Sequence, residues 1–187
     1  MPGVIKFYGR NNPYGEFSNF YVRPIVIENV TWPVGTEQYF QAMKSEDPDV
    51  QEHIRTKLTR PGEIKDYCSG GAGKVKLRAD WDASIMGLSP EALKLFTDEQ
   101  GLVVDRVKDH IMYQALVAKF TQHADLGKVL LNTGAAFLVE DTQQANTDPY
   151  WGNGPAGDGL NKLGRMLMLV RQALPRHRQE SERLMRP

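Results

Sequence analysis

Residues 36–44 place a carboxylate, an amide and an ammonium group along one face of an expected helix. Glu37, Gln41 and Lys44 follow the three- and four-residue spacing that brings side chains onto the same side of a helix. The other sides are rich in aromatic residues, and Trp32 lies just upstream. A solvated surface helix rarely combines its charges with so many rings. We therefore interpret this helix as the wall of a pocket.

Glu37 is the first candidate for catalysis. Thr36 is expected to cap the helix with its hydroxyl group, which makes Glu37 the first helical residue. At that position the helix dipole stabilises a carboxylate by roughly 0.3–1 kcal/mol, whereas burial among rings raises its pKa. An ionised carboxylate there can activate water or stabilise a developing cation. The alternative is an acid that only satisfies the helix dipole, and the sequence leaves both interpretations open.

A glycine-rich loop at residues 148–159 contains the second candidate site. Tyr150 and Trp151 are large rings in a segment that is expected at the surface, where they can stack on a flat heterocycle. Asp148 supplies a second carboxylate. The alternative is a loop held against the core by its rings. A calcium loop is disfavoured because the alternating ligand pattern is absent.

Residues 69–78 combine glycines with Lys74, Lys76 and Arg78. The spacing does not match a nucleotide phosphate loop, but backbone amides and a guanidinium group can bind a terminal phosphate. Arg78, three residues before Trp81, is the better candidate, and the lysines fit a solvated loop.

Two asparagines are further candidates for ligand contacts. Asn19, next to Phe20, follows a glycine-rich segment, and Asn161 lies at the start of the last expected helix. Each can bind polar ligand groups, and each can equally stabilise a turn or a helix end.

The composition is that of an ordinary soluble protein. The 187 residues carry 23 basic and 23 acidic side chains, so no net charge favours nucleic acid or membrane binding. A single cysteine, Cys68, excludes an internal disulfide, and the four histidines show no metal-ligand spacing. We expect a cytoplasmic protein with no metal, no cofactor and no membrane segment.

The order of expected elements indicates one α+β domain. Short strands cluster early in the chain and helices dominate later, which predicts a small, mostly antiparallel sheet surrounded by helices. Glu28 and Asn29 form a plausible hairpin turn between residues 25–27 and 30–32. The domain is expected to cover residues 1–174, with the last helix ending before Pro175. Residues 175–187 are expected to be a frayed polar tail.

Many short motifs in order make the chain resemble the NADAR superfamily between residue 4 and about residue 174. The motifs are Phe7-Tyr8, residues 14–20, Trp32-Pro33, residues 36–44, Leu77-Arg78, Trp81, Met112, Ala115-Leu116, Lys119-Phe120, Leu130-Leu131, residues 138–140, Asp148, residues 150–152, Asn161, Leu163-Gly164 and Arg171. Two departures stand out. Gln38 occupies a position where the family commonly has His, and residues 85–100 look inserted.

The resemblance implies a YbiA-like fold and an N-glycosidase. Its bacterial YbiA-like members cleave phosphoribosylaminopyrimidine intermediates of riboflavin biosynthesis to ribose 5-phosphate and the free aminopyrimidine. On this basis Glu37 is the principal catalytic carboxylate and Asp148 a second acid/base or ribose-binding group. The expected substrate-binding residues are Asn19, Phe20, Trp32, Lys44, Arg78, Trp81, Tyr150, Trp151 and Asn161.

Two alternative functions remain open at this point. One is removal of ADP-ribose from modified nucleic acid, or action on another ADP-ribose compound, because the bond chemistry is shared. The other is a binding module without catalysis. The sequence does not determine the oligomeric state.

Overall fold

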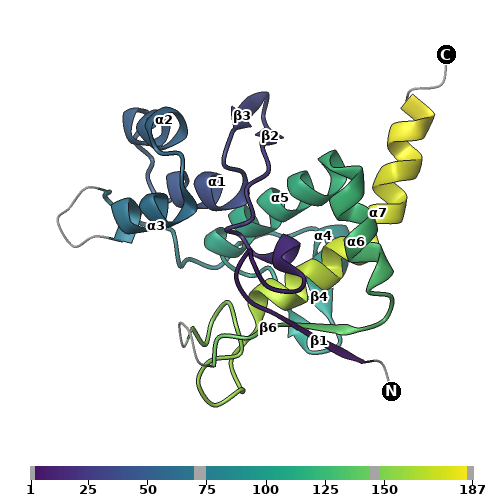
Figure 1. Cartoon of the computed structure of the whole chain (residues 1–187). Coiled ribbons are helices and arrows are strands. Elements are labelled where there is room, and N and C mark those ends of the chain that lie inside the picture. Colours follow the sequence, from purple (N-terminus) through teal and green to yellow (C-terminus); the bar gives the residue numbers. More distant parts are fainter. Residues whose placement is uncertain (1–2, 70–74, 144–147, 185–187) are drawn as a thin grey trace.

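The structure is a computed structural model that describes residues 3–69, 75–143 and 148–184, with side chains described up to residue 177. Within these ranges the chain forms seven α-helices and six short strands (Figure 1). The elements in chain order are β1 (Val4–Phe7), the 3-10 helix η1 (Gly15–Phe17), β2 (Ile25–Ile27), β3 (Val30–Trp32), α1 (Thr36–Ala42), α2 (Pro48–Lys57), α3 (Pro61–Ser69), α4 (Pro90–Phe96), β4 (Thr97–Asp98), β5 (Gly101–Leu102), α5 (Val107–Gln122), α6 (Ala124–Asn132), β6 (Phe137–Glu140) and α7 (Lys162–Leu184).

The expected α+β class is confirmed, but the strands are distributed over three pairs. β2 and β3 form an antiparallel hairpin, as do β4 and β5, while β1 pairs in parallel with β6. Glu28 and Asn29 have φ angles of 53° and 63°, which are the values that a tight hairpin turn requires. The pairs remain apart because helices fill the space between them (Figure 1).

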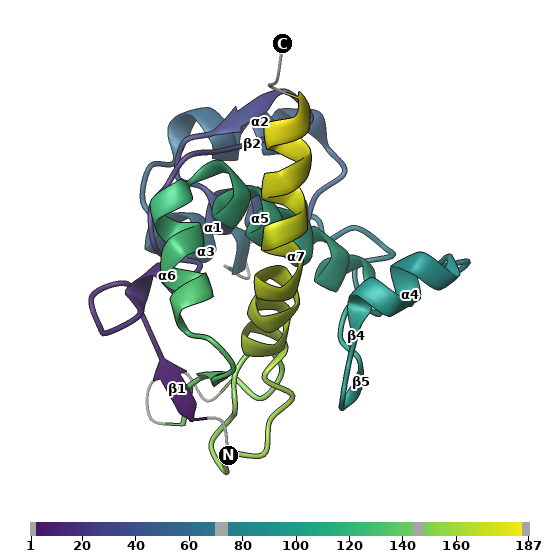
Figure 2. The ribbon, with the colours of Figure 1, turned by 90° about the vertical axis from the view of Figure 1, so that its right-hand side faces the viewer.

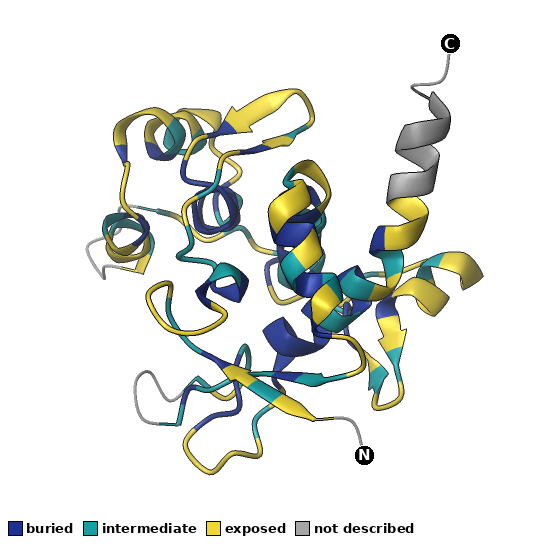
Figure 3. Cartoon of the chain, turned by 45° about the vertical axis from the view of Figure 1, so that its right-hand side comes forward, coloured by how far each residue is buried: buried dark blue, intermediate teal, exposed yellow. Residues whose placement is uncertain are grey.

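Helix α1 lies inside the molecule and packs against α2, α3 and α5. All seven of its residues are buried, as the continuous dark-blue helix in Figure 3 shows. The buried carboxamide of Gln38 accepts a hydrogen bond from the Val34 amide and donates to carbonyls at the end of α2, including that of Leu58. Gln38 thus ties α1 to its neighbour and satisfies polar groups that would otherwise be buried without partners.

The expected cap of α1 is wrong by one residue. Gly35 is the N-cap, and Thr36 is already helical, with a buried hydroxyl group that has no hydrogen-bond partner among the described residues. Gly35 has a φ angle of 89°, and a Cβ atom there would collide with the Arg23 carbonyl oxygen. The close approach of Arg23 therefore determines where the helix begins.

The expected end of the last helix is also wrong, because α7 continues through Pro175 to Leu184. Proline removes one backbone donor, which normally ends or bends a helix. Here Leu174 is fully buried, and Arg171 donates to the Thr133 hydroxyl and the Ala136 carbonyl. These contacts hold the turn of the helix that precedes the proline. No helix of the described chain is long and apolar enough to cross a membrane.

The apparent insertion forms a projection from the main body. Figure 2 shows α4, β4 and β5 standing away from the rest of the molecule. Ser89 caps α4 as expected, because its hydroxyl group accepts a hydrogen bond from the Ala92 amide. Arg165 of α7 binds Asp98 with two nitrogen atoms, at 2.6 and 2.7 Å, which fixes the base of the projection.

Gly35→Ala should destabilise the protein strongly, since the new methyl group would collide with the Arg23 carbonyl oxygen and the residue would have to keep a positive φ angle. We expect a loss of roughly 3 kcal/mol or more in the free energy of unfolding, measured by urea denaturation. The matched control is Gly134→Ala, where φ is 56° but nothing lies within 4 Å of the new methyl group. That variant should lose only about 1 kcal/mol. Equal losses of stability in the two variants would show that the positive φ angle, and not the collision with Arg23, causes the destabilisation.

Candidate functional site

A cavity of about 220 Å³ lies where α1, α3 and the segment after η1 meet the end of β6 and the loop that follows it. We call it the carboxylate pocket because three of its lining residues are acids. The lining consists of Ser18, Asn19, Phe20, Glu37, Phe40, Gln41, Lys44, Lys65, Ser69, Met112, Glu140, Asp148 and Trp151. Six of the sequence-predicted site residues are therefore brought together: Asn19, Phe20, Glu37, Lys44, Asp148 and Trp151.

Glu37 lies on the α1 wall of the pocket with only 4% of its surface exposed. Burial raises its pKa, whereas the hydrogen bond from Gln41 and the charges of Lys65 and Lys44 lower it. The Gln41 amide nitrogen donates to the Glu37 carboxylate at 2.7 Å. Burial outweighs these effects, so the pKa of Glu37 lies above that of an exposed glutamate.

Two lysines face the acids in the pocket. Lys44 follows α1 and Lys65 belongs to α3, and their ammonium groups lie 5.9 and 5.8 Å from the rings of Phe40 and Phe20. Burial lowers the pKa of Lys44. Lys65 was missed by sequence reasoning, because only the packing of α3 on α1 brings it to the pocket.

Glu140 was also missed, although it ends β6 just before the 148–159 loop. Burial raises the pKa of Glu140 to about 8, and the nearby charges of Asp148 and Glu37 contribute to this increase. The charge of Lys65 acts in the opposite direction and lowers the pKa. A signal was present, since the residue belongs to one of the family-like motifs.

Asp148 has two tasks in the structure. It lines the pocket, and its Oδ1 atom accepts hydrogen bonds from the amides of Tyr150 and Trp151 at 2.8 and 3.0 Å. Such a carboxylate stabilises the turn that carries both rings. Asp148 can therefore stabilise the loop and contact a ligand at the same time.

The rings of the loop point in different directions. Trp151 lines the pocket and meets the Phe40 ring edge-on at a centroid distance of 5.4 Å. Tyr150 lies outside the lining, because its hydroxyl group donates to buried Asp109 at 2.7 Å and the Lys108 ammonium group covers its ring at 3.7 Å. Tyr150 anchors the loop, so the expected stacking position falls to Trp151 alone.

Three other predicted residues lie outside the lining. Arg78 is paired with Asp80 through two nitrogen atoms, at 2.5 and 2.9 Å. Trp81 supports the pocket from behind, with its ring 5.1 Å from that of Phe40. Trp32 is buried against another ring of α1. The glycine-rich segment at residues 70–74, including Lys74, lies outside the described residues.

Two buried acceptors in the pocket lack hydrogen-bond partners among the described residues. They are Oδ1 of Asn19 and Oε1 of Gln41. The hydrogen bond from Gln41 to Glu37 leaves that oxygen free. Lys119, fully buried in α5, fixes the neighbouring segment by donating to the Ser18 carbonyl at 2.9 Å. An unpaired buried acceptor is costly, so this pocket suits a ligand that presents N–H or O–H donors.

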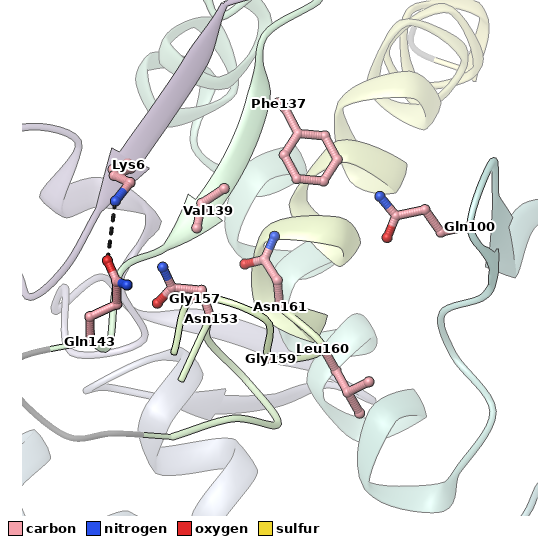
Figure 4. A pocket seen from close by; sticks show the side chains of 10 residues that line it. All are labelled: Lys6, Gln100, Phe137, Val139, Gln143, Asn153, Gly157, Gly159, Leu160 and Asn161. Atoms are coloured by element: carbon pink, nitrogen blue, oxygen red, sulfur yellow. Dashed lines mark hydrogen bonds between the residues drawn. The ribbon is translucent and has the colours of Figure 1, made fainter. Parts of the chain in front are cut away.

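A second cavity, of about 380 Å³, lies beside β6 (Figure 4). Asn161 lines it, but its carboxamide accepts from the Glu140 amide and donates to the Leu138 carbonyl. Asn153 is likewise engaged, and Lys6 donates to Gln143. Because these side chains already have hydrogen-bond partners, the cavity offers few free polar groups. Asn161 therefore stabilises the end of β6 through its two hydrogen bonds.

The acids do not form a metal centre in the described part of the chain. No group of three or more His, Cys, Asp or Glu side chains there is placed to hold one ion. Cys68 is partly buried, and burial raises the pKa of its thiol to about 11, which disfavours a nucleophilic thiolate.

Known proteins resemble this chain over nearly its whole length. The NADAR domain model matches residues 6–175. N-glycosidase YbiA of Shigella flexneri is 38% identical over 172 residues, covering 91% of this chain and 88% of that protein. A riboflavin biosynthesis protein of Vibrio vulnificus is 31% identical over 95% of this chain and 40% of its own length. The NMR structure of the Escherichia coli protein YbiA superposes with a TM-score of 0.69 at 34% identity, covering 100% of this chain and 90% of that one.

Glu140→Gln should change how stability depends on pH. The raised pKa means that the folded wild type is fully stabilised below the unfolded pKa near 4.5 and loses this contribution as pH rises through about 8. The variant should therefore gain roughly 2 kcal/mol relative to wild type between pH 5 and pH 9. The pKa shift from 4.5 to about 8 corresponds to about twice this free energy at roughly 1.4 kcal/mol per pKa unit. We halve the value because solvent screens a side chain that is partly exposed.

Urea denaturation at several pH values measures this difference. Asp141→Asn is the matched control on the neighbouring residue. Burial raises the pKa of Asp141, but the hydrogen bonds of Lys6 and Asn153 outweigh it, so the pKa is lowered. The contribution of Asp141 to the free energy of unfolding is therefore constant from pH 5 to pH 9. A parallel pH dependence of wild type and Glu140→Gln would contradict the raised pKa.

Proposed function

The chain belongs to the NADAR domain family, and from that premise we propose that it is an N-glycosidase of phosphoribosylaminopyrimidines. The reaction hydrolyses the C1–N bond and releases ribose 5-phosphate and the free aminopyrimidine. The observation that carries the proposal is the carboxylate pocket, where buried Glu37 faces two lysines, two further acids and an aromatic ring. The riboflavin-related name of the Vibrio relative supports the substrate class.

Glu37 suits the chemistry at C1. Breaking the C1–N bond builds positive charge on the sugar ring, which a close carboxylate stabilises. The same carboxylate can accept a proton from the attacking water, and its raised pKa makes it a better base near neutral pH. Gln41 holds the group in place. Asp148, which also lines the pocket, would contact the ribose hydroxyl groups.

Lys65 and Lys44 would bind the 5-phosphate. Both ammonium groups line the pocket, whereas Arg78 is committed to Asp80 outside it. The phosphate assignment therefore moves from Arg78 to Lys65. Trp151 would cover the pyrimidine, and the free oxygens of Asn19 and Gln41 would accept from its amino groups or from the sugar.

A second candidate function is the removal of ADP-ribose from a modified base. The bond is again C1–N, and two lysines in the pocket can serve a diphosphate as well as a monophosphate. Mass-spectrometric detection of products from phosphoribosylaminopyrimidines and from ADP-ribosylated DNA, offered side by side, distinguishes the two.

Glu37→Gln should reduce kcat by 10²–10⁴-fold while substrate binding persists, because shape is kept and only the charge is lost. Single-turnover hydrolysis and equilibrium binding on the same preparation measure both quantities. Glu46→Gln, an exposed carboxylate shortly after α1, is the control and should behave as wild type. Wild-type turnover in Glu37→Gln would contradict the assignment, and saturable binding without product in every variant would favour a binding module.

Lys65→Met should lower kcat/KM for the 5-phosphorylated substrate by about 10–100-fold, the worth of one charge-assisted hydrogen bond. The dephosphorylated riboside should lose much less, since it lacks the group that Lys65 binds and is affected only through the charge that Lys65 places near Glu37 and Glu140. Arg78→Met is the comparison variant and should affect neither substrate selectively. A selective loss in Arg78→Met, with none in Lys65→Met, would place the phosphate outside the carboxylate pocket.

A further inference from the structure

Glu140 shares the carboxylate pocket with Glu37 and Asp148, yet the reaction described so far gives it no task. Its position is rigid, because its backbone amide donates to Asn161 at 2.9 Å and its carbonyl accepts from the Asn153 amide at 3.0 Å. The end of β6 therefore holds the backbone of Glu140 in place, with its side chain in the pocket lining.

The three carboxyl groups differ in their partners. Glu37 accepts from Gln41, and one oxygen of Asp148 accepts from two backbone amides. Glu140 receives no hydrogen bond from the described side chains, and burial together with two acids disfavours its charge. Of the three groups, it is the one whose carboxyl oxygens meet no hydrogen-bond donor among the described residues, so its proton is left for a ligand acceptor.

We propose that Glu140 is the general acid of the site and donates its proton to the glycosidic nitrogen as the C1–N bond breaks. This rests on the proposed function. An aminopyrimidine nitrogen is a poor leaving group as an anion, so the reaction needs a proton donor close to it. Glu37 acts at C1, and the two glutamates divide the work as an acid and a base.

The step balances as a simple hydrolysis. The C1–N bond breaks and its electron pair remains on nitrogen, which takes the proton from the Glu140 carboxyl group. The oxygen of one water molecule bonds to C1, and its proton goes to the Glu37 carboxylate. Glu37 then releases that proton to solvent, and Glu140 takes one up. The products are the free amine and the sugar with a new hydroxyl group at C1.

The surroundings of Glu140 keep it protonated near neutral pH. Charged groups face it from three sides: Glu37 from α1, Lys65 from α3 and Asp148 from the loop, with Lys44 also lining the pocket. The two acids and burial prevail over the lysine, which is why the pKa reaches about 8. Such a value suits an acid that must be protonated at pH 7 and still give up its proton.

The kinetic test compares two leaving groups. Glu140→Gln should lose 10²–10³-fold in kcat on the phosphoribosylaminopyrimidine, and the alkaline limb of the kcat/KM pH profile should disappear. On 4-nitrophenyl riboside 5-phosphate, whose leaving group needs no proton, the same variant should stay within about fivefold of wild type. Glu37→Gln should be impaired on both substrates. Equal losses of Glu140→Gln on both, or full activity on the amine, would overturn the proposal.

A titration separates this proposal from the proposed function. In the free enzyme, carboxyl ¹³C shifts of labelled glutamate, assigned by their loss in Glu140→Gln, should show Glu140 ionising near pH 8. Ionisation in the usual carboxyl range would overturn the acid whatever the substrate is. A wild type that cleaves no phosphoribosylaminopyrimidine, while Glu140 still titrates near pH 8, would contradict the substrate and leave the acid supported.

Discussion

The structure depends on one constraint, which is that a helix buried on all sides must carry a functional carboxylate. Burying polar groups is costly unless each finds a partner. Gln38 meets this need towards α2 and Gln41 meets it towards Glu37. The Gln41–Glu37 hydrogen bond lies within the helix and orients the carboxylate on it. Gln38 fixes the rotation of α1 about its axis, because turning the helix would break its hydrogen bonds to Val34 and to the end of α2. That rotation points Glu37 into the pocket, where the surrounding helices exclude water and raise its pKa.

Local chemistry accounts for the features that the sequence predicted well. Ser89 caps α4 through its hydroxyl group and Asp47 caps α2 through its carboxylate, each at a capping residue followed by proline, which is a helix-start signal in the sequence itself. The hairpin turn at Glu28 and Asn29 likewise needs only two neighbouring residues with positive φ. Glu37 was found because its motif is contiguous. In each of these cases the residues that decide the structure are close together in the chain, so their spacing is informative.

The features that could not be predicted arise from contacts between distant segments. Tyr150 is turned away by Asp109, 41 residues earlier. Arg78 is an exception, because its partner Asp80 is only two residues away and was not considered as a partner from the sequence. Lys65 and Glu140 gained their positions from the packing of α3 and from the pairing of β6 with β1. Spacing along one helix or loop carries no information about such encounters. A charged residue in a sequence is therefore a candidate, and its partners decide whether it is free to act.

The lysines link substrate binding to proton transfer. The charge of Lys65 lowers the pKa of both Glu37 and Glu140. When a phosphate dianion binds Lys65, its charge offsets that of the ammonium group, so both carboxyl groups hold protons more strongly. For Glu140 this is favourable, because the acid stays protonated until the C1–N bond weakens. For Glu37 it is unfavourable, and the hydrogen bond from Gln41 together with the positive charge that develops at C1 must counter it. A phosphate at Lys65 thus shifts the two glutamates towards the acid form at the moment when one of them has to donate, while the sugar cation itself restores the charge of the other.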